Sequence, residues 1–134
     1  MKITTLKAAD TWAIRQAILW TDYPLDFVKL EEDELGIHWG IKEGALLVSV
    51  ISFFITDTTI QFRKLATLPD YRNKGYAGHL IKAIIDYAKS HHITTVWCNS
   101  RADKTTFYEH LNFKASSGIF EKNGQLYVRM EYKL

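Results

Sequence analysis

Apolar residues recur along the chain with two different periods, and the change between them marks out the expected elements. Between residues 77 and 88, alanine, leucine and isoleucine recur at intervals of three and four, which predicts a long helix with one buried face. Residues 45–55 are rich in β-branched and aromatic side chains, which favours a strand buried on both faces. One amphipathic helix and one buried strand are therefore the clearest elements.

Turn signals separate the other expected elements. Glu43-Gly44, Asp57-Thr58 and Asn123-Gly124 are typical of tight turns between strands. Asp10 or Thr11 is expected to cap a helix beginning near residue 12, because a short side-chain oxygen accepts a backbone N–H there. The expected strands are 2–8, 37–42, 45–55, 59–68, 93–98, 113–120 and 125–132, and the expected short helices are 25–35 and 103–110.

The order of these elements is β, α, α, β, β, β, α, β, α, β, β. This order predicts an α/β fold with a mixed, mostly antiparallel central sheet and flanking helices. The segment 59–98 is expected to form one right-handed parallel crossover, a βαβ unit. Within the strand 59–68, Arg63 and Leu65 are expected on one face of the sheet, and Lys64 and Ala66 on the other.

Composition limits the class of protein. With 134 residues, of which 47% are hydrophobic and 24% charged, residues 1–134 are expected to form a single folded domain. The one cysteine, Cys98, favours a reducing compartment, and no apolar stretch approaches the length of about 20 residues that a membrane-spanning helix needs, so a cytoplasmic protein is expected. A net charge of +2 is too small to indicate a nucleic-acid partner.

The strongest chemical signal is the run Arg72-Asn73-Lys74-Gly75-Tyr76-Ala77-Gly78, between an expected strand and the long helix. The first N–H groups of a helix lack internal partners, and the helix dipole adds positive charge there. Small residues let an anion approach the backbone, so the run predicts a phosphate or pyrophosphate site. The alternative is that the small residues only allow tight packing. The run matches neither the Walker loop nor the dinucleotide-binding fingerprint.

Three segments of the chain resemble motifs of one family. The pattern Arg72-x-x-Gly75-x-Ala77, preceded by Leu65 to Tyr71, resembles the acetyl-CoA motif of the GCN5-related N-acetyltransferases, the GNAT superfamily. The segment Phe107 to Phe113 is similar to that family's Phe-Tyr-Glu-x-x-Gly-Phe segment, and Asn99-Ser100-Arg101 is similar to its Asn-Ala-Arg. The order of elements also fits this fold, so the resemblance covers nearly the whole chain.

The resemblance implies a GNAT-type fold and acetyl-CoA as the acetyl donor, with no metal. It implies that two strands, 59–68 and 93–98, separate to admit the cofactor, and that the backbone N–H near Thr67 polarises the thioester carbonyl. Tyr108 would protonate the leaving thiolate. The residues implied in cofactor binding are Leu65, Ala66, Thr67, Arg72, Asn73, Lys74, Gly75, Tyr76, Ala77, and one or both of Asn99 and Arg101.

The sequence departs from the family pattern at several positions. Gln61 stands where histone-acetylating members carry a glutamate, so the base that deprotonates the amine stays open between a water chain and several side chains. Asn112 replaces the glycine before Phe113, which is tolerable because asparagine accepts a positive φ. The side chains considered as a base are His38, Glu31, Glu32, Asp33 and Glu34.

These observations predict an N-acetyltransferase that moves an acetyl group from acetyl-CoA to a primary amine by direct attack in a ternary complex. The alternative is a non-catalytic acyl-CoA-binding or regulatory module on the same fold. The acceptor would be a small-molecule amine or a protein amine, with Trp20 and Tyr23 in the region that lines the acceptor site in the family. The aromatic-rich C-terminal strands are a candidate surface for a homodimer. The histidines and Cys98 show no metal-ligand spacing, and Cys98 is expected to be a core thiol.

Overall fold

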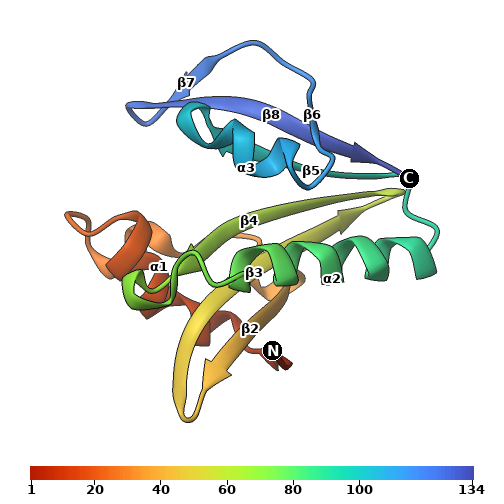
Figure 1. Ribbon diagram of the computed structural model, residues 1–134. Helices are drawn as coiled ribbons and strands as arrows, with labels where there is room; N and C mark the ends of the chain where they lie inside the picture. Colours follow the sequence, from red (N-terminus) through yellow and green to blue (C-terminus); the bar gives the residue numbers. More distant parts are fainter. The chain divides into compact units, whose positions relative to one another are not determined.

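One mixed sheet organises the chain. In a computed structural model, the backbone of residues 1–134 is described, with every side chain except that of Phe27. The strands described there are β1 (Ile3–Leu6), β2 (Ile37–Glu43), β3 (Leu46–Thr56), β4 (Thr59–Thr67), β5 (Thr95–Arg101), β6 (Lys114–Ala115), β7 (Phe120–Lys122) and β8 (Gln125–Lys133). They are ordered β1-β2-β3-β4-β5-β8-β6, with β7 paired to β8 (Figure 1). The sheet is mostly antiparallel and β4 pairs with β5 in parallel, which confirms the predicted fold class.

By its internal contacts the chain divides into two units, residues 1–54 with 62–83, and residues 55–61 with 84–134. Three elements contribute residues to both units, the strands β3 and β4 and the helix α2 (Tyr76–Ser90). The helix α2 confirms the predicted periodicity, since Leu80, Ile81 and Ile84 have no exposed surface. Among the described residues, no helix combines the length and apolarity needed to cross a membrane.

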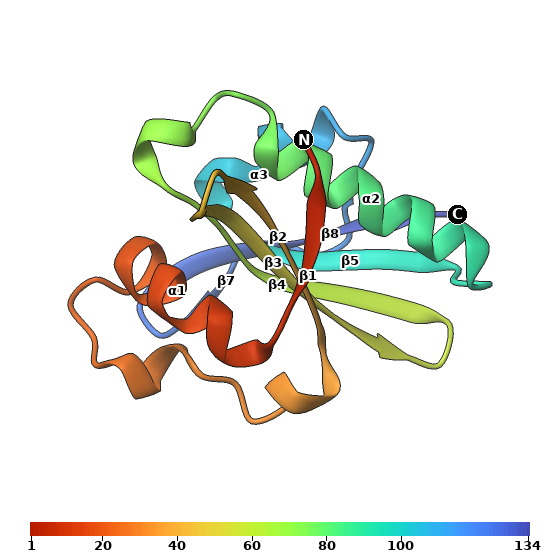
Figure 2. The same ribbon diagram turned by 90° about the horizontal axis from the view of Figure 1, so that it is seen from below.

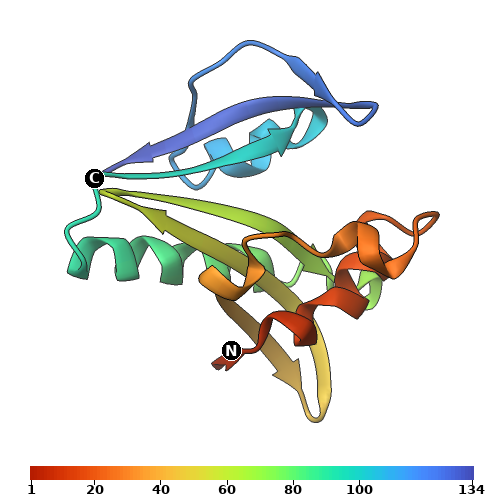
Figure 3. The same cartoon turned by 180° about the vertical axis from the view of Figure 1, so that it is seen from behind.

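The first unit is an antiparallel arrangement with a small apolar core. The hairpin of β2 and β3 is visible in Figure 3, and β1 pairs with the outer side of β2. The helix α1 (Trp12–Leu19) contributes Ile14 to a buried cluster with Val50 of β3 and Ala66 of β4. Partly buried side chains pack against this cluster, namely Leu6, Ile18, Leu19, Leu47 and Leu68.

The helix predicted over residues 25–35 is wrong. This segment instead forms two 3₁₀ turns, η2 (Leu25–Val28) and η3 (Asp33–Leu35), and α1 lies beside the first of them (Figure 2). The backbone groups between the turns find partners outside any helix. Leu30 donates its N–H to Asp33 Oδ2 at 3.0 Å, and the Val28 carbonyl accepts from Arg15 Nη1 at 3.0 Å. Side chains therefore satisfy the polar groups that a continuous helix would have paired internally.

The Arg15 side chain is the centre of a buried polar network in this unit. Its guanidinium has no exposed surface and forms a two-point ion pair with Asp33, at 2.9 and 3.1 Å. Its Nη2 also donates to Ser52 Oγ at 2.8 Å, and Trp12 Nε1 donates to Asp33 Oδ2 at 3.0 Å. Burial raises the pKa of Asp33, but the hydrogen bonds from Arg15, Leu30 and Trp12 outweigh it and hold that pKa below its ordinary value.

Two further details differ from the sequence expectations. Neither Asp10 nor Thr11 caps α1 with its side chain. Asp10 accepts the N–H of Lys7 at 2.9 Å and so closes the preceding 3₁₀ turn η1 (Ala8–Thr11), while the Thr11 hydroxyl donates to the Ala8 carbonyl. In β4, Lys64 has a φ of 58°, so its backbone is left-handed and the expected alternation of faces is interrupted there.

The second unit is built on an antiparallel pair. β5 and β8 pair from Thr95↔Lys133 to Arg101↔Tyr127, and the short helix α3 (Thr105–Glu109) follows β5 after the 3₁₀ turn η5 (Ala102–Lys104). The strand predicted over 113–120 is divided into β6 and β7, because the Ser117 hydroxyl accepts the N–H of Arg129 in β8 at 2.9 Å. A side chain thus replaces the strand partner at that point.

Replacing Asp33 by alanine should destabilise the protein strongly. The substitution leaves the guanidinium of Arg15 buried without its counter-charge, and removing one partner of a buried ion pair typically costs about 3–5 kcal/mol. We expect the free energy of unfolding, measured by urea denaturation, to fall by about that amount. The matched control is Asp26→Ala, which removes a carboxylate from an exposed pair with Lys29 and should leave the midpoint unchanged. Equal effects of both substitutions would contradict the importance of the network.

Candidate cofactor and catalytic site

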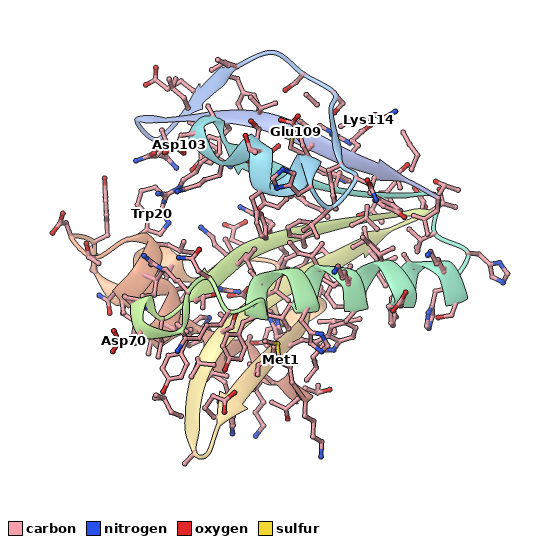
Figure 4. All side chains as sticks on the ribbon, viewed as in Figure 1. Met1, Trp20, Asp70, Asp103, Glu109 and Lys114 are labelled. Carbon is pink, nitrogen blue, oxygen red and sulfur yellow. The ribbon has the colours of Figure 1, made fainter. Side chains whose placement is uncertain are left out.

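The loop between β4 and α2 is folded back on the end of β4. Leu68 donates its N–H to the Val48 carbonyl of β3 at 2.8 Å, and the 3₁₀ turn η4 (Pro69–Tyr71) follows, in which Figure 4 labels Asp70. Arg72 Nε then donates to the Thr67 carbonyl at 3.2 Å. Two predicted site residues, one from the strand and one from the loop, are therefore in direct contact.

The first turn of α2 has the geometry of an anion site. Gly75 has a φ of 89° and accepts the N–H of His79 at 3.0 Å, so the helix begins immediately after it. Asn73 is also left-handed, with a φ of 59°. The N–H groups of a first helical turn point outward along the axis, and a Cβ built on Gly78 would meet no atom within 4 Å. The residues at this helix start therefore fit a bound phosphate group.

Side chains in the loop have different environments. The lysine amine of Lys74 lies 5.5 Å from the centre of the Tyr71 ring. Tyr76 is only 8% exposed and directs its hydroxyl to Glu43 Oε1 at 2.5 Å, so only its backbone belongs to the surface of the helix start. Ala66 is buried in the core cluster, which leaves its backbone as its means of contacting a cofactor.

The parallel pairing of β4 with β5 is short. It joins Thr59–Gln61 to Thr95–Trp97, and both segments belong to the second unit. The left-handed Lys64 follows three residues later. The backbone groups of Leu65, Ala66 and Thr67 therefore lie outside the parallel ladder.

Tyr108 lies on α3 among aromatic side chains and beside a thiol. Its ring makes edge contacts with Phe107 and Phe113, at centroid distances of 5.0 and 5.9 Å. The thiol of Cys98 in β5 lies beside its hydroxyl. Burial and the nearby Cys98 both raise the pKa of Tyr108, so the phenol keeps its proton at neutral pH. No local pattern predicts this pair, because its members are ten positions apart and lie on different elements.

The structure separates Tyr108 from the two other predicted residues of this unit. Successive side chains of β5 point to opposite faces of the sheet, so Asn99 and Arg101 share one face and Cys98 lies on the other. Asn99 is exposed opposite Arg129, and Arg101 is half-buried opposite Tyr127. Because Tyr108 lies beside Cys98, its hydroxyl is on the face that Asn99 and Arg101 do not share. Figure 4 labels Asp103 and Glu109, which lie in η5 and at the end of α3.

Most of the side chains considered as a base have structural partners. Asp33 is engaged with Arg15, and both ring nitrogens of His38 are hydrogen bonded, to Ser52 Oγ at 2.6 Å and to the Asp33 carbonyl at 2.8 Å. Glu32 forms an ion pair with Arg63. Glu31 and Glu34 are exposed. Among the residues that the structure describes, no group of three or more histidine, cysteine, aspartate or glutamate side chains is arranged to hold a metal ion.

Comparison with known proteins identifies the family to which this fold and loop belong. Residues 29–134 match the model of the acetyltransferase (GNAT) domain, so the chain belongs to the GNAT family of N-acetyltransferases. It is 28% identical over 133 residues to the uncharacterized N-acetyltransferase YitI of Bacillus subtilis, covering 92% of this chain and 89% of YitI.

Solved structures share the fold at low sequence identity. A protein from Lactobacillus plantarum, provisionally described as an N-acetyltransferase, superposes with a TM-score of 0.89 at 20% identity, covering 99% of this chain and 97% of that chain. A GNAT family acetyltransferase from Elizabethkingia anophelis with acetyl-CoA bound gives a TM-score of 0.78 at 14% identity, with coverage of 99% and 97%. These likenesses extend the family assignment to the three-dimensional fold.

The environment of Cys98 predicts an unreactive thiol. The side chain is 3% exposed, and burial raises its pKa, an effect that the neighbouring Tyr108 hydroxyl opposes only in part. Because the thiolate is the reactive species, the folded protein at pH 8 should react with Ellman's reagent at least about 100-fold more slowly than the protein unfolded in urea. Comparable rates in the two states would show that the thiol is accessible and ionised, contrary to this description.

Proposed function

We propose that this protein transfers an acetyl group from acetyl-CoA to a primary amine, which attacks the thioester directly in a ternary complex. The observation that carries the proposal is the start of α2, where a left-handed Gly75, an outward-pointing first turn and two loop cations coincide. Family membership supports the reaction class, and the loop supports the donor. The acceptor is proposed to be a small-molecule amine or a protein amine.

In this proposal the loop 72–77 binds the pyrophosphate of the cofactor. The first-turn N–H groups donate hydrogen bonds, and the helix dipole adds favourable electrostatic energy. Arg72 and Lys74 supply positive charge from the same loop. Because Arg72 also donates to the Thr67 carbonyl, it links the charged loop to the end of β4. The backbone of Leu65 to Thr67 is proposed to bind the pantetheine arm and, through an N–H near Thr67, to polarise the carbonyl that reacts.

Tyr108 is proposed to be the general acid. The phenol is protonated across the neutral range, which is the form that a general acid requires. The sulfur of Cys98 lies beside its hydroxyl, and a sulfur atom is also what a leaving thiolate presents. The cofactor supplies the activated acetyl thioester. The protein supplies orientation, a hydrogen bond at the carbonyl and a proton at the sulfur.

Water is the proposed route for the proton that leaves the amine. Asp33 and His38 are committed to the buried network around Arg15, and Glu32 is paired with Arg63. Gln61 has no basic group. A water chain therefore accounts for deprotonation without breaking a structural contact. A measurement of turnover distinguishes this proposal from the alternative, a non-catalytic acyl-CoA-binding module.

We further propose that residues 1–134 act as one catalytic domain. The strand β4 and the helix α2 each contribute residues to both units. The alignment with YitI, which covers 92% of this chain, supports treating the chain as a whole.

Reversing charge in the loop should abolish cofactor binding. By isothermal titration calorimetry, we expect the unmodified protein to bind acetyl-CoA with a micromolar dissociation constant, about −8 kcal/mol. The double substitution Arg72→Glu with Lys74→Glu should weaken binding by at least about 100-fold, since it replaces two attractive charges by two repulsive ones. The matched control reverses two exposed charges elsewhere on α2, Lys82→Glu with Lys89→Glu, and should bind as before. No binding by the unmodified protein would refute the proposed function.

Removing the Tyr108 hydroxyl should slow transfer without affecting cofactor binding. With an amine that supports thiol release from acetyl-CoA, Tyr108→Phe should lower kcat by about 100-fold, the lower end of the usual contribution of a general acid. The dissociation constant for acetyl-CoA should be unchanged. Tyr132→Phe, which removes a hydroxyl from a ring packed on Phe113, is the matched control and should keep full activity. Full activity of Tyr108→Phe would remove Tyr108 from the mechanism.

A further inference from the structure

The phenol of Tyr76 is directed away from the surface on which its backbone lies. Tyr76 is the first residue of α2, a position where side chains are usually exposed, yet only 8% of it is accessible to solvent. Its hydroxyl donates to Glu43 Oε1 at 2.5 Å, and 33 positions separate the two residues. Both belong to the first unit. The start of α2 is therefore attached to the end of β2.

Glu43 holds a fixed position in the sheet. It is the last residue of β2 and pairs with Leu46 across the hairpin, whose turn contains Gly44 with a φ of 61°. A register shift between Ile41 and Lys42 directly precedes this pairing. A carboxylate on a paired strand is a better anchor than one on a mobile loop, because the ladder has already fixed its backbone.

The loop before α2 is tethered at both ends. At its beginning, Arg72 donates to the Thr67 carbonyl at 3.2 Å. At its end, Tyr76 donates to Glu43, and the Tyr71 ring contacts the Tyr76 ring edge-on at a centroid distance of 6.1 Å. The left-handed residues lie between the two tethers. These contacts hold the loop in one conformation directly before the first N–H groups of α2.

The sign of the charge on Glu43 indicates what it does. A carboxylate near a site for a pyrophosphate is electrostatically unfavourable, so direct attraction of the cofactor does not account for it. Its partner is a hydroxyl and not a cation, so its negative charge is not cancelled by a salt bridge. What the carboxylate does supply is a strong hydrogen-bond acceptor for the phenol.

We propose that Glu43, acting through the hydroxyl of Tyr76, is a positioning residue for the cofactor site. The tether holds the first turn of α2 in the orientation that presents its N–H groups to the pyrophosphate. This inference rests on the proposed function, in which the start of α2 binds acetyl-CoA. Glu43 itself touches neither the cofactor nor the reacting atoms in this account.

The test is to titrate variants with acetyl-CoA in a calorimeter. The variants separate the role of Glu43 as a hydrogen-bond acceptor from the role of its negative charge. Glu43→Ala and Tyr76→Phe should each weaken binding by about three- to tenfold, because each removes one hydrogen bond to a charged group. Glu43→Gln keeps an acceptor oxygen and a weaker, neutral hydrogen bond, so it should lose clearly less binding than Glu43→Ala. Tyr71→Phe removes a hydroxyl from the same loop while keeping the ring beneath Lys74, and should have no effect.

Two further readouts distinguish a positioning role from general destabilisation. The weakening should be the same for acetyl-CoA, CoA and dephospho-CoA, because all three carry the pyrophosphate. The combined variant Glu43→Ala with Tyr76→Phe should be no weaker than either single variant, since both remove the same bond. Without ligand, exchange of the His79 amide hydrogen, which is bonded to the Gly75 carbonyl at the start of α2, should be faster in both single variants and unchanged in Tyr71→Phe.

The outcomes separate this inference from the proposed function. If the unmodified protein fails to bind acetyl-CoA, the proposed function and the inference both fail. If it binds, and Glu43→Ala and Tyr76→Phe bind equally well, only the inference fails. Equal weakening by Glu43→Gln and Glu43→Ala would also overturn it, because the charge and not the acceptor would then be responsible. Tyr76→Phe differs by one oxygen atom, so loss of folding should not obscure its result.

Discussion

A guanidinium group without exposed surface needs a counter-charge within reach, and Arg15 imposes that requirement on the first unit. Asp33 satisfies it with both oxygens, and the Val28 carbonyl and the Ser52 hydroxyl accept the remaining hydrogen bonds. With Asp33 directed inward, the segment after α1 forms two 3₁₀ turns in place of the predicted helix. The buried charge and the path of this segment are thus linked through one ion pair.

The same network extends to β2 and β3 and limits what the acidic run can do. Ser52 joins Arg15 to His38, and His38 joins the sheet to the Asp33 carbonyl. A histidine whose two ring nitrogens are both hydrogen bonded holds these elements together. The segment around Asp33 is therefore anchored to the sheet through side chains. Its remaining acidic groups, Glu31 and Glu34, are exposed.

The elements predicted best from the sequence are those whose signals are local. The period of α2, the turns at Gly44 and Gly124, and the small residues at the start of α2 each depend on neighbours within a few positions. The contacts that escaped prediction join distant positions, such as Arg15 with Asp33 and Tyr76 with Glu43. An arginine in an amphipathic helix is normally expected to be exposed. Only its buried partner, Asp33, shows that Arg15 is not. The left-handed backbone of Lys64 was not predicted for another reason, since lysine is not a residue type that indicates a positive φ.

Two phenols with raised pKa values differ in how firmly each is held. The carboxylate of Glu43 raises the pKa of Tyr76 for two reasons. It accepts a hydrogen bond from the protonated phenol, and its negative charge disfavours a phenolate beside it. A charged acceptor makes that bond strong, which suits a tether. Burial is the main cause for Tyr108, and the polar group beside its hydroxyl is the weakly accepting sulfur of Cys98. A hydroxyl held by a weak acceptor is oriented at little energetic cost, and it exchanges readily for a thiolate, which accepts more strongly. The strength of each acceptor therefore agrees with the part proposed for each tyrosine, the one fixed and the other available for proton transfer.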